Sequence, residues 1–302
     1  GVGRGKIPTM TDAPPRVLSA RGLRGFLLLA GALALFQFLA DLVRVPPAWS
    51  GMLSVAAGVA ILALSLSALF LGASSGLRGR SAFALLTAGA LGMALLVWSS
   101  KALGSSVLAS LALALGQACL LTACLGLGTL VAGAIKEPNL LAPMCLFLPF
   151  FDAFLVLTQK GPTKRVMEAA PQVLENVAMR VPEVSSGPKE APLAPVALIG
   201  PADLVFVALF AAILHRFNLN SRGTLLWLAP SLAAYLLVVM VAGDAKIGPV
   251  SLNALPALVP IGIVVLLTNV RRLRLTREEW ALTALAGLLG LGLVALGSSF
   301  GS

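Results

Sequence analysis

Apolar stretches about as long as a bilayer is thick recur along this whole chain. Of its 302 residues, 58% are hydrophobic and only 11% are charged, whereas about a quarter of the residues in a soluble domain are charged. About 20 consecutive apolar residues cross a bilayer as a helix. Lipid offers no partners to backbone polar groups, so such stretches satisfy their hydrogen bonds internally. The sequence therefore predicts an all-α polytopic membrane protein.

We predict nine transmembrane helices in this chain. They run near residues 25–45, 51–73, 81–99, 105–134, 139–159, 198–217, 223–242, 249–269 and 278–298. The stretch 105–134 is longer than one straight span needs. We expect Gly126 and Gly128 to break or tilt it, or the stretch to contain two short segments.

The basic residues predict the topology. The net charge is +10, but Lys and Arg lie in the connections between apolar stretches, which indicates lipid headgroups as partners and not nucleic acid. With the N-terminus inside, 14 Lys and Arg fall on the inner side and 8 on the outer side. We therefore expect the N-terminus inside and the C-terminus outside. The Ala-, Leu- and Arg-rich composition suggests a prokaryotic cytoplasmic membrane.

The chain divides into four parts by composition. Residues 1–24 are interpreted as a vector remnant followed by a mobile basic tail, and 25–159 as an N-terminal transmembrane bundle. Residues 160–197 form an extramembrane loop, and 198–302 form a C-terminal bundle. The first half of the loop places six apolar residues on one helical face, which predicts an amphipathic surface helix. These are Val166, Ala170, Val173, Leu174, Val177 and Val181. The second half is rich in Pro, Gly and polar residues and is interpreted as flexible.

Two acidic residues lie deep inside predicted spans. Of five aspartates, only Asp152 and Asp203 are well inside apolar helices, and these two helices are consecutive. A charge in a span costs roughly 2.5–3.5 kcal/mol on insertion scales, so such a residue usually has a partner or a function. Two facing carboxylates repel each other when both are ionised, so they share a proton. One can then activate a water molecule while the other donates a proton to a carbonyl oxygen. From the residues alone, helix packing and an ion pathway remain alternatives.

Three short motifs resemble one known family. Phe-Phe-Asp-Ala-Phe at 150–154 is similar to a Tyr-Asp motif, and Gly-Pro-Ala-Asp at 200–203 is similar to Gly-x-Gly-Asp. Pro-Ala-Leu at 256–258 is identical to a third motif. In this order and in membrane helices, the motifs resemble the intramembrane aspartyl proteases, the presenilin and signal peptide peptidase group. The resemblance covers about residues 113–270 and suggests a prokaryotic homologue.

The resemblance implies a presenilin-like fold and a catalytic pair, Asp152 and Asp203. It also implies that a set of neighbouring residues contacts substrate. These are Phe151, Leu198, Gly200, Pro201, Ala202, Pro256, Ala257 and Leu258. The implied substrates are transmembrane helices or signal peptides, with no cofactor and no metal. The extended-prone stretch before Gly200, Pro-Val-Ala-Leu-Ile, is a candidate edge for strand addition by an unwound substrate.

The chain departs from the family at three points. Phe151 lacks the tyrosine hydroxyl, and Ala202 adds a methyl group where the second glycine would stand. The family usually has six spans up to and including the Tyr-Asp helix, whereas five are predicted here up to the Asp152 helix. The family usually ends after the Pro-Ala-Leu helix, whereas one further C-terminal helix is predicted here. With the N-terminus inside, the orientation of the pair then resembles signal peptide peptidase and not presenilin.

The sequence leaves three alternative functions open. The first is a proton- or cation-coupled transporter or channel that uses the same two aspartates. The second is a catalytically weak scaffold that binds substrate without turnover. The third is a prepilin-peptidase-like protease, against which the Pro-Ala-Leu motif argues. The three cysteines, Cys119, Cys124 and Cys145, are interpreted as small buried apolar residues.

Overall fold

A computed structural model describes most of the chain. The described residues are 19–43, 45–104, 106–157, 177–181, 197–242, 246–247, 250–251, 257–273 and 275–299. They form nine α-helices: α1 (Ala20–Leu42), α2 (Pro47–Ala73), α3 (Gly79–Leu103), α4 (Val107–Ala134), α5 (Leu141–Leu157), α8 (Pro201–Arg216), α9 (Ser221–Ala242), α10 (Leu258–Asn269) and α11 (Arg277–Ser299). Two 3₁₀ turns and four short strands complete them: Pro138–Leu140, Val270–Arg272, β1 (Met179–Val181), β2 (Ala197–Ile199), β3 (Lys246–Ile247) and β4 (Val250–Ser251).

The protein is all-α and has helices suited to a membrane. Five described helices are long and apolar enough to cross a bilayer: Ala20–Leu42, Ala48–Ala73, Gly79–Leu103, Val107–Ala134 and Ser221–Val239. The helices α8 and α10 have 16 and 12 residues. At 1.5 Å per residue, both are shorter than a hydrocarbon core of about 30 Å.

Several helix ends differ from the prediction. Helix α1 begins at Ala20 because the Ser19 side chain accepts a hydrogen bond from Gly22 N–H, so residues 20–24 belong to the helix and not to the tail. Helix α8 begins at Pro201, since β2 occupies the preceding residues, and α10 begins only at Leu258. The tail 1–18 lies outside the described residues.

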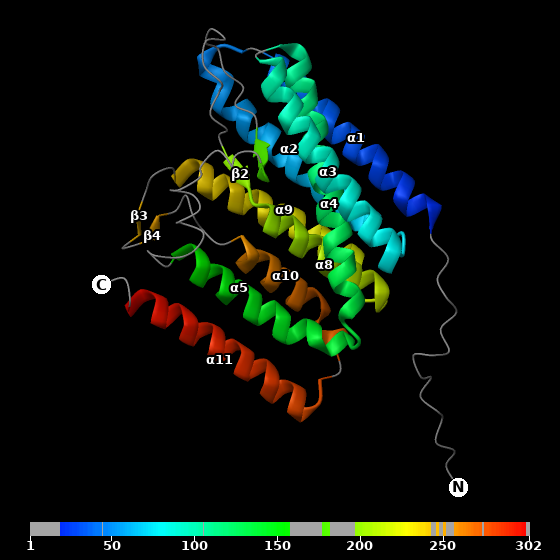
Figure 1. The fold of residues 1–302 in the computed structure, drawn as a ribbon. Coiled ribbons are helices and arrows are strands. Elements are labelled where there is room, and N and C mark those ends of the chain that lie inside the picture. The colour runs from blue at the N-terminus through cyan, green and yellow to red at the C-terminus, as the bar shows by residue number, and fades with distance from the viewer. Residues whose placement is uncertain are drawn as a thin grey trace.

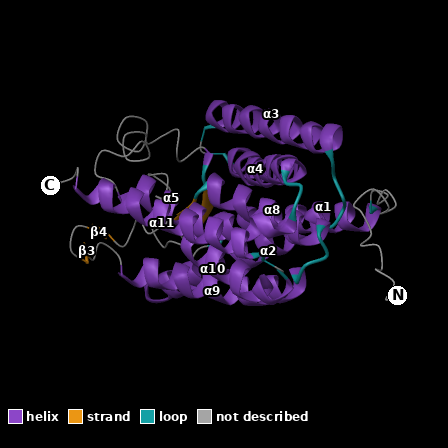
Figure 2. Cartoon of the chain, turned by 90° about the horizontal axis from the view of Figure 1, so that it is seen from below, coloured by secondary structure: helices purple, strands orange, loops and turns teal. Residues whose placement is uncertain are grey.

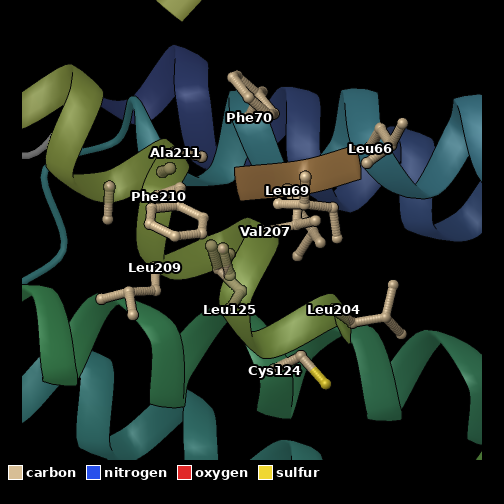
Figure 3. Close-up of a cluster of buried hydrophobic side chains, with 14 of the residues drawn as sticks. Leu66, Leu69, Phe70, Cys124, Leu125, Leu204, Val207, Leu209, Phe210 and Ala211 are labelled. Carbon is tan, nitrogen blue, oxygen red and sulfur yellow. The ribbon is translucent and has the colours of Figure 1, made fainter. Parts of the chain in front are cut away.

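The helices run roughly side by side in a layered bundle (Figure 1). Helices α5 and α11 lie along one edge and α1 along the other, with α8, α9 and α10 between them. Figure 2 shows α3 outermost, covering α4. Helix α8 lies at the centre, and its residues from Val207 to Leu214 are all buried. Its side chains gather with Leu125 of α4 and Leu69 of α2 (Figure 3). A helix that is apolar all round is one that is buried on every face.

Helix α4 is one continuous helix, so the predicted break at its glycines is wrong. Gly126 and Gly128 serve close helix packing instead. A Cβ on Gly126 would clash with the backbone N of Leu86 in α3. A Cβ on Gly128 would lie 2.6 Å from Ala208 Cβ and 2.7 Å from the backbone N of Leu209 in α8. Small residues permit such close approach between membrane helices.

The described part of the loop contains a strand where the sequence predicted the end of a surface helix. Strand β1 pairs antiparallel with β2, with Met179 opposite Ile199 and Val181 opposite Ala197. Met179 and Val181 are buried, with the half-buried Arg180 between them. Pairing with β2 and this two-residue alternation override the helical pattern, so Val181 is not on a helical face. The extended conformation predicted before Gly200 is confirmed for Ala197–Ile199. The rest of the loop, including Val166 to Leu174, lies outside the described residues.

Candidate functional site

Asp203 lies in the first turn of α8, and its neighbours explain its position. Gly200 is the N-cap of α8 and Pro201 follows at the first helical position, where proline costs no hydrogen bond. The Asp203 carboxylate turns back and accepts a hydrogen bond from the Gly200 backbone, as the third residue of a helix does in a capping box. A Cβ on residue 200 would lie 3.1 Å from Asp203 Oδ2. Glycine at this position therefore leaves room for the carboxylate.

Asp152 lies near the end of α5 and contacts the start of α10. Its Oδ2 accepts a hydrogen bond of 3.3 Å from the backbone N–H of Leu258. Leu258 is the first residue of α10, and Ala257 is its N-cap. The first N–H groups of a helix have no partner within the helix, and the helix dipole makes this end positive. Ala257 and Leu258 of the Pro-Ala-Leu motif thus supply a positive helix end and a backbone donor to Asp152.

Two close helix contacts hold this end of α5. A Cβ on Gly262 of α10 would lie 2.5 Å from Cys145 O and 2.6 Å from Pro149 Cγ. On the other side, a Cβ on Gly290 of α11 would lie 2.5 Å from Phe150 Cβ. Helix α5 is therefore packed tightly between α10 and α11 one turn before Asp152.

The two aspartates come together although their helices are different. The charges of Asp152 and Asp203 interact with each other, and both side chains are partly buried. Each carboxylate lies at the N-terminal end of a helix, Asp203 within α8 and Asp152 against α10. Two interacting carboxylates, each of which accepts a hydrogen bond from a backbone N–H, form an arrangement that can share one proton and activate water.

Sequence reasoning missed Tyr235 of α9. Its phenol interacts electrostatically with both Asp203 and Asp152. It is seven residues after the buried Leu228 and three after the buried Leu232, so it shares their inward helix face. It is also the only tyrosine in the chain, which is a signal the sequence did contain. Phe151, by contrast, is 39% exposed and stacks on Phe147 at a centroid distance of 5.9 Å.

We expect Tyr235→Phe to lower the kcat of the peptide cleavage proposed below by roughly tenfold, or about 1.4 kcal/mol, because the change removes the phenol that interacts electrostatically with both carboxylates. The change removes only the hydroxyl, so the thermal midpoint should stay close to that of the wild type. Trp227→Phe, on the exposed side of α9, is the matched control. An unchanged kcat in Tyr235→Phe would show that the phenol takes no part.

The other predicted substrate-contacting residues are dispersed around this centre. Leu198 lies in β2 opposite Arg180, and the Pro201 carbonyl accepts a weak hydrogen bond of 3.7 Å from Cys124 Sγ. Ala202 is exposed, so its methyl group does not crowd a neighbouring helix. Pro256 lies outside the described residues.

The cysteines differ in burial, and the described residues contain no cluster of metal-ligating side chains. Cys124 and Cys145 are buried as predicted, whereas Cys119 is only half-buried. Within the described ranges, no three His, Cys, Asp or Glu side chains lie close enough to hold a metal ion.

Comparisons with models of known protein families, with curated proteins and with solved structures find no match to this chain.

Proposed function

We propose that this protein is an intramembrane aspartyl protease of the presenilin and signal peptide peptidase type, with a similar fold and nine spans. Its substrates would be transmembrane helices or signal peptides. The observation that carries the proposal is the interaction between Asp152 and Asp203, two carboxylates brought together from separate apolar helices. Intramembrane ionisable residues are costly and are kept where they perform a function.

The reaction follows from one shared proton. The ionised carboxylate takes a proton from a water molecule as the water oxygen bonds to the scissile carbonyl carbon. The protonated carboxylate gives its proton to the carbonyl oxygen, which forms a neutral gem-diol. The C–N bond then breaks. The carboxyl group that was protonated by water gives its proton to the amide nitrogen, and one hydroxyl proton of the gem-diol passes to the other carboxylate. The pair acts as a unit, and it ends the cycle with one proton as it began.

The position of strand β2 is suited to a substrate helix that is locally unwound. A helical peptide bond has its N–H and C=O groups engaged within the helix, so the helix must open before water reaches the carbonyl. Strand β2 ends at Ile199, directly before Gly200 and Asp203. An opened substrate segment that adds to β2 as a further strand would regain its backbone hydrogen bonds beside the aspartates.

The test uses purified protein in liposomes with a model transmembrane peptide. We expect mass spectrometry to detect two new peptide ends, and a transition-state inhibitor of aspartyl proteases to suppress them. Absence of cleavage at every substrate and pH tested would reject the proposal.

A proton- or cation-coupled transporter is the second candidate function. The phenol of Tyr235 interacts with both carboxylates, and three such groups could relay protons along a membrane path. This function predicts pH-driven flux in sealed liposomes without peptide cleavage. If the protein is a catalytically weak scaffold, we expect peptide binding with neither flux nor cleavage.

We propose that the N-terminus is inside, in a prokaryotic cytoplasmic membrane. Arg78 at the start of α3 is then inside and Lys101 near its end is outside, in line with the positive-inside rule. In intact cells, a membrane-impermeant maleimide should label Lys101→Cys and should not label Arg78→Cys. The unsubstituted protein, whose own cysteines are buried or half-buried, measures the background. The reverse labelling pattern would show that the N-terminus is outside.

A further inference from the structure

Two buried glutamines hold the strand that pairs with β2. Gln117 of α4 donates from Nε2 to the Ala178 carbonyl at 3.4 Å and accepts through Oε1 from Arg180 N–H at 3.3 Å. Gln37 of α1 donates from Nε2 to the Arg180 carbonyl at 3.4 Å. Both glutamines are more than nine-tenths buried. Buried amides on apolar helices are costly unless they are paired, and these two are paired to the backbone of one short segment.

The pattern of these contacts identifies which edge of β1 they occupy. Alternate residues of a strand present their N–H and C=O groups to opposite edges. The glutamines take the groups of Ala178 and Arg180, so Met179 and Val181 present theirs to β2, with which they pair. The amide of Gln117 thus bonds as a neighbouring strand would, one acceptor and one donor two residues apart.

Other contacts hold the same segment in place. The hydroxyl of Ser65 in α2 contacts Met179 Sδ at 3.3 Å, and the side chain of Met179 is fully buried. The charge of Arg180 interacts with Asp41 of α1. Strand β1 is therefore fixed by α1, α2 and α4, which are all helices of the N-terminal half.

We propose that Gln117 and Gln37 are positioning residues that fix β1, close its outer edge and so direct a substrate strand to the outer edge of β2, along which no described segment pairs. This inference rests on the proposed function. The two-stranded ribbon has two outer edges. Since glutamine side chains occupy the edge on β1, the edge of the described ribbon that remains for a further strand is the one on β2, which leads directly into Gly200 and Asp203.

The two glutamines are expected to contribute unequally. Gln117 uses both ends of its amide, whereas Gln37 Oε1 is buried without a hydrogen-bond partner among the described residues. Replacing Gln37 removes one hydrogen bond and also one unsatisfied acceptor, which is itself unfavourable. Loss of Gln117 should therefore release β1 to a greater extent than loss of Gln37.

The experiment compares Gln117→Met and Gln37→Met, which keep side-chain length without the amide. The matched control is Thr122→Val on α4, because Thr122 donates to Ala118 O of its own helix and has no other hydrogen bond among the described residues. Hydrogen–deuterium exchange of the peptide containing 177–181 reports on the strand. Steady-state cleavage of the transmembrane peptide reports on whether a released β1 changes substrate binding. The thermal midpoint monitors folding.

We expect exchange at 177–181 to rise about tenfold in Gln117→Met and less in Gln37→Met. The KM should rise about tenfold in Gln117→Met with kcat within twofold of the wild type, and cleavage positions should spread along the peptide. Thr122→Val should match the wild type. Unchanged exchange in Gln117→Met, or raised exchange with wild-type KM and cleavage positions, overturns the inference. If the wild type itself cleaves nothing, the proposed function fails and the substrate role falls with it, while the exchange result still decides whether Gln117 anchors β1.

Discussion

Asp152→Asn and Asp203→Asn are each expected to lower kcat for cleavage of a transmembrane peptide by at least about a hundredfold, the lower range for loss of a general acid or base. Asparagine has the same shape as aspartate but cannot exchange a proton with water. In Asp152→Asn the amide oxygen can still accept the hydrogen bond from Leu258 N–H. The loss of cleavage would then reflect chemistry and not the position of α10.

Stability separates the catalytic role from a purely structural one. Each replacement keeps the shape of the side chain and places a neutral group beside the other carboxylate, so the thermal midpoint should not fall in either variant. Glu278→Gln, at an exposed carboxylate in the first turn of α11, is the control for loss of a negative charge. Wild-type turnover in either asparagine variant would refute the catalytic assignment. The wild type should also show a bell-shaped dependence of kcat on pH, since one carboxylate must be ionised and the other protonated.

Gly128→Ala is expected to destabilise the protein by about 1–3 kcal/mol, the usual cost of overpacking a tight interior. The added methyl group would lie 2.6 Å from Ala208 Cβ, 2.7 Å from Leu209 N and 2.8 Å from Val205 O. Two of these atoms belong to the backbone of α8 and cannot rotate away. Helix α8 must therefore shift, and Asp203 in its first turn shifts with it, so cleavage should fall as well.

Gly133→Ala on the same helix is the matched control, because nothing lies within 4 Å of a Cβ at that position. Alanine is the better helix former by up to about 1 kcal/mol, so this variant should be as stable as the wild type or more stable. Thermal unfolding in one detergent measures both variants. Equal midpoints for Gly128→Ala and Gly133→Ala would contradict the close packing of α4 on α8.

The helices and the two buried acids could be predicted from the sequence. Long apolar stretches have few alternatives in lipid, so all nine predicted stretches contain a described helix. Asp152 and Asp203 were identifiable because charge inside such stretches is rare. Helix starts were predicted less well, since they depend on single capping and strand contacts. Ser19 extended α1 towards the N-terminus, and β2 delayed the start of α8.

The local sequence determined the all-α membrane class and the placement of two carboxylates within apolar helices, because both follow from hydrophobicity along the chain. Only the tertiary structure decided what surrounds those carboxylates. The N–H of Leu258 and the phenol of Tyr235 come from segments distant in sequence. Such contacts depend on which helix faces meet, and the faces meet through glycines such as Gly128 and Gly262. Nearly every residue of these helices is apolar, so hydrophobic patterning alone could not tell one face from another.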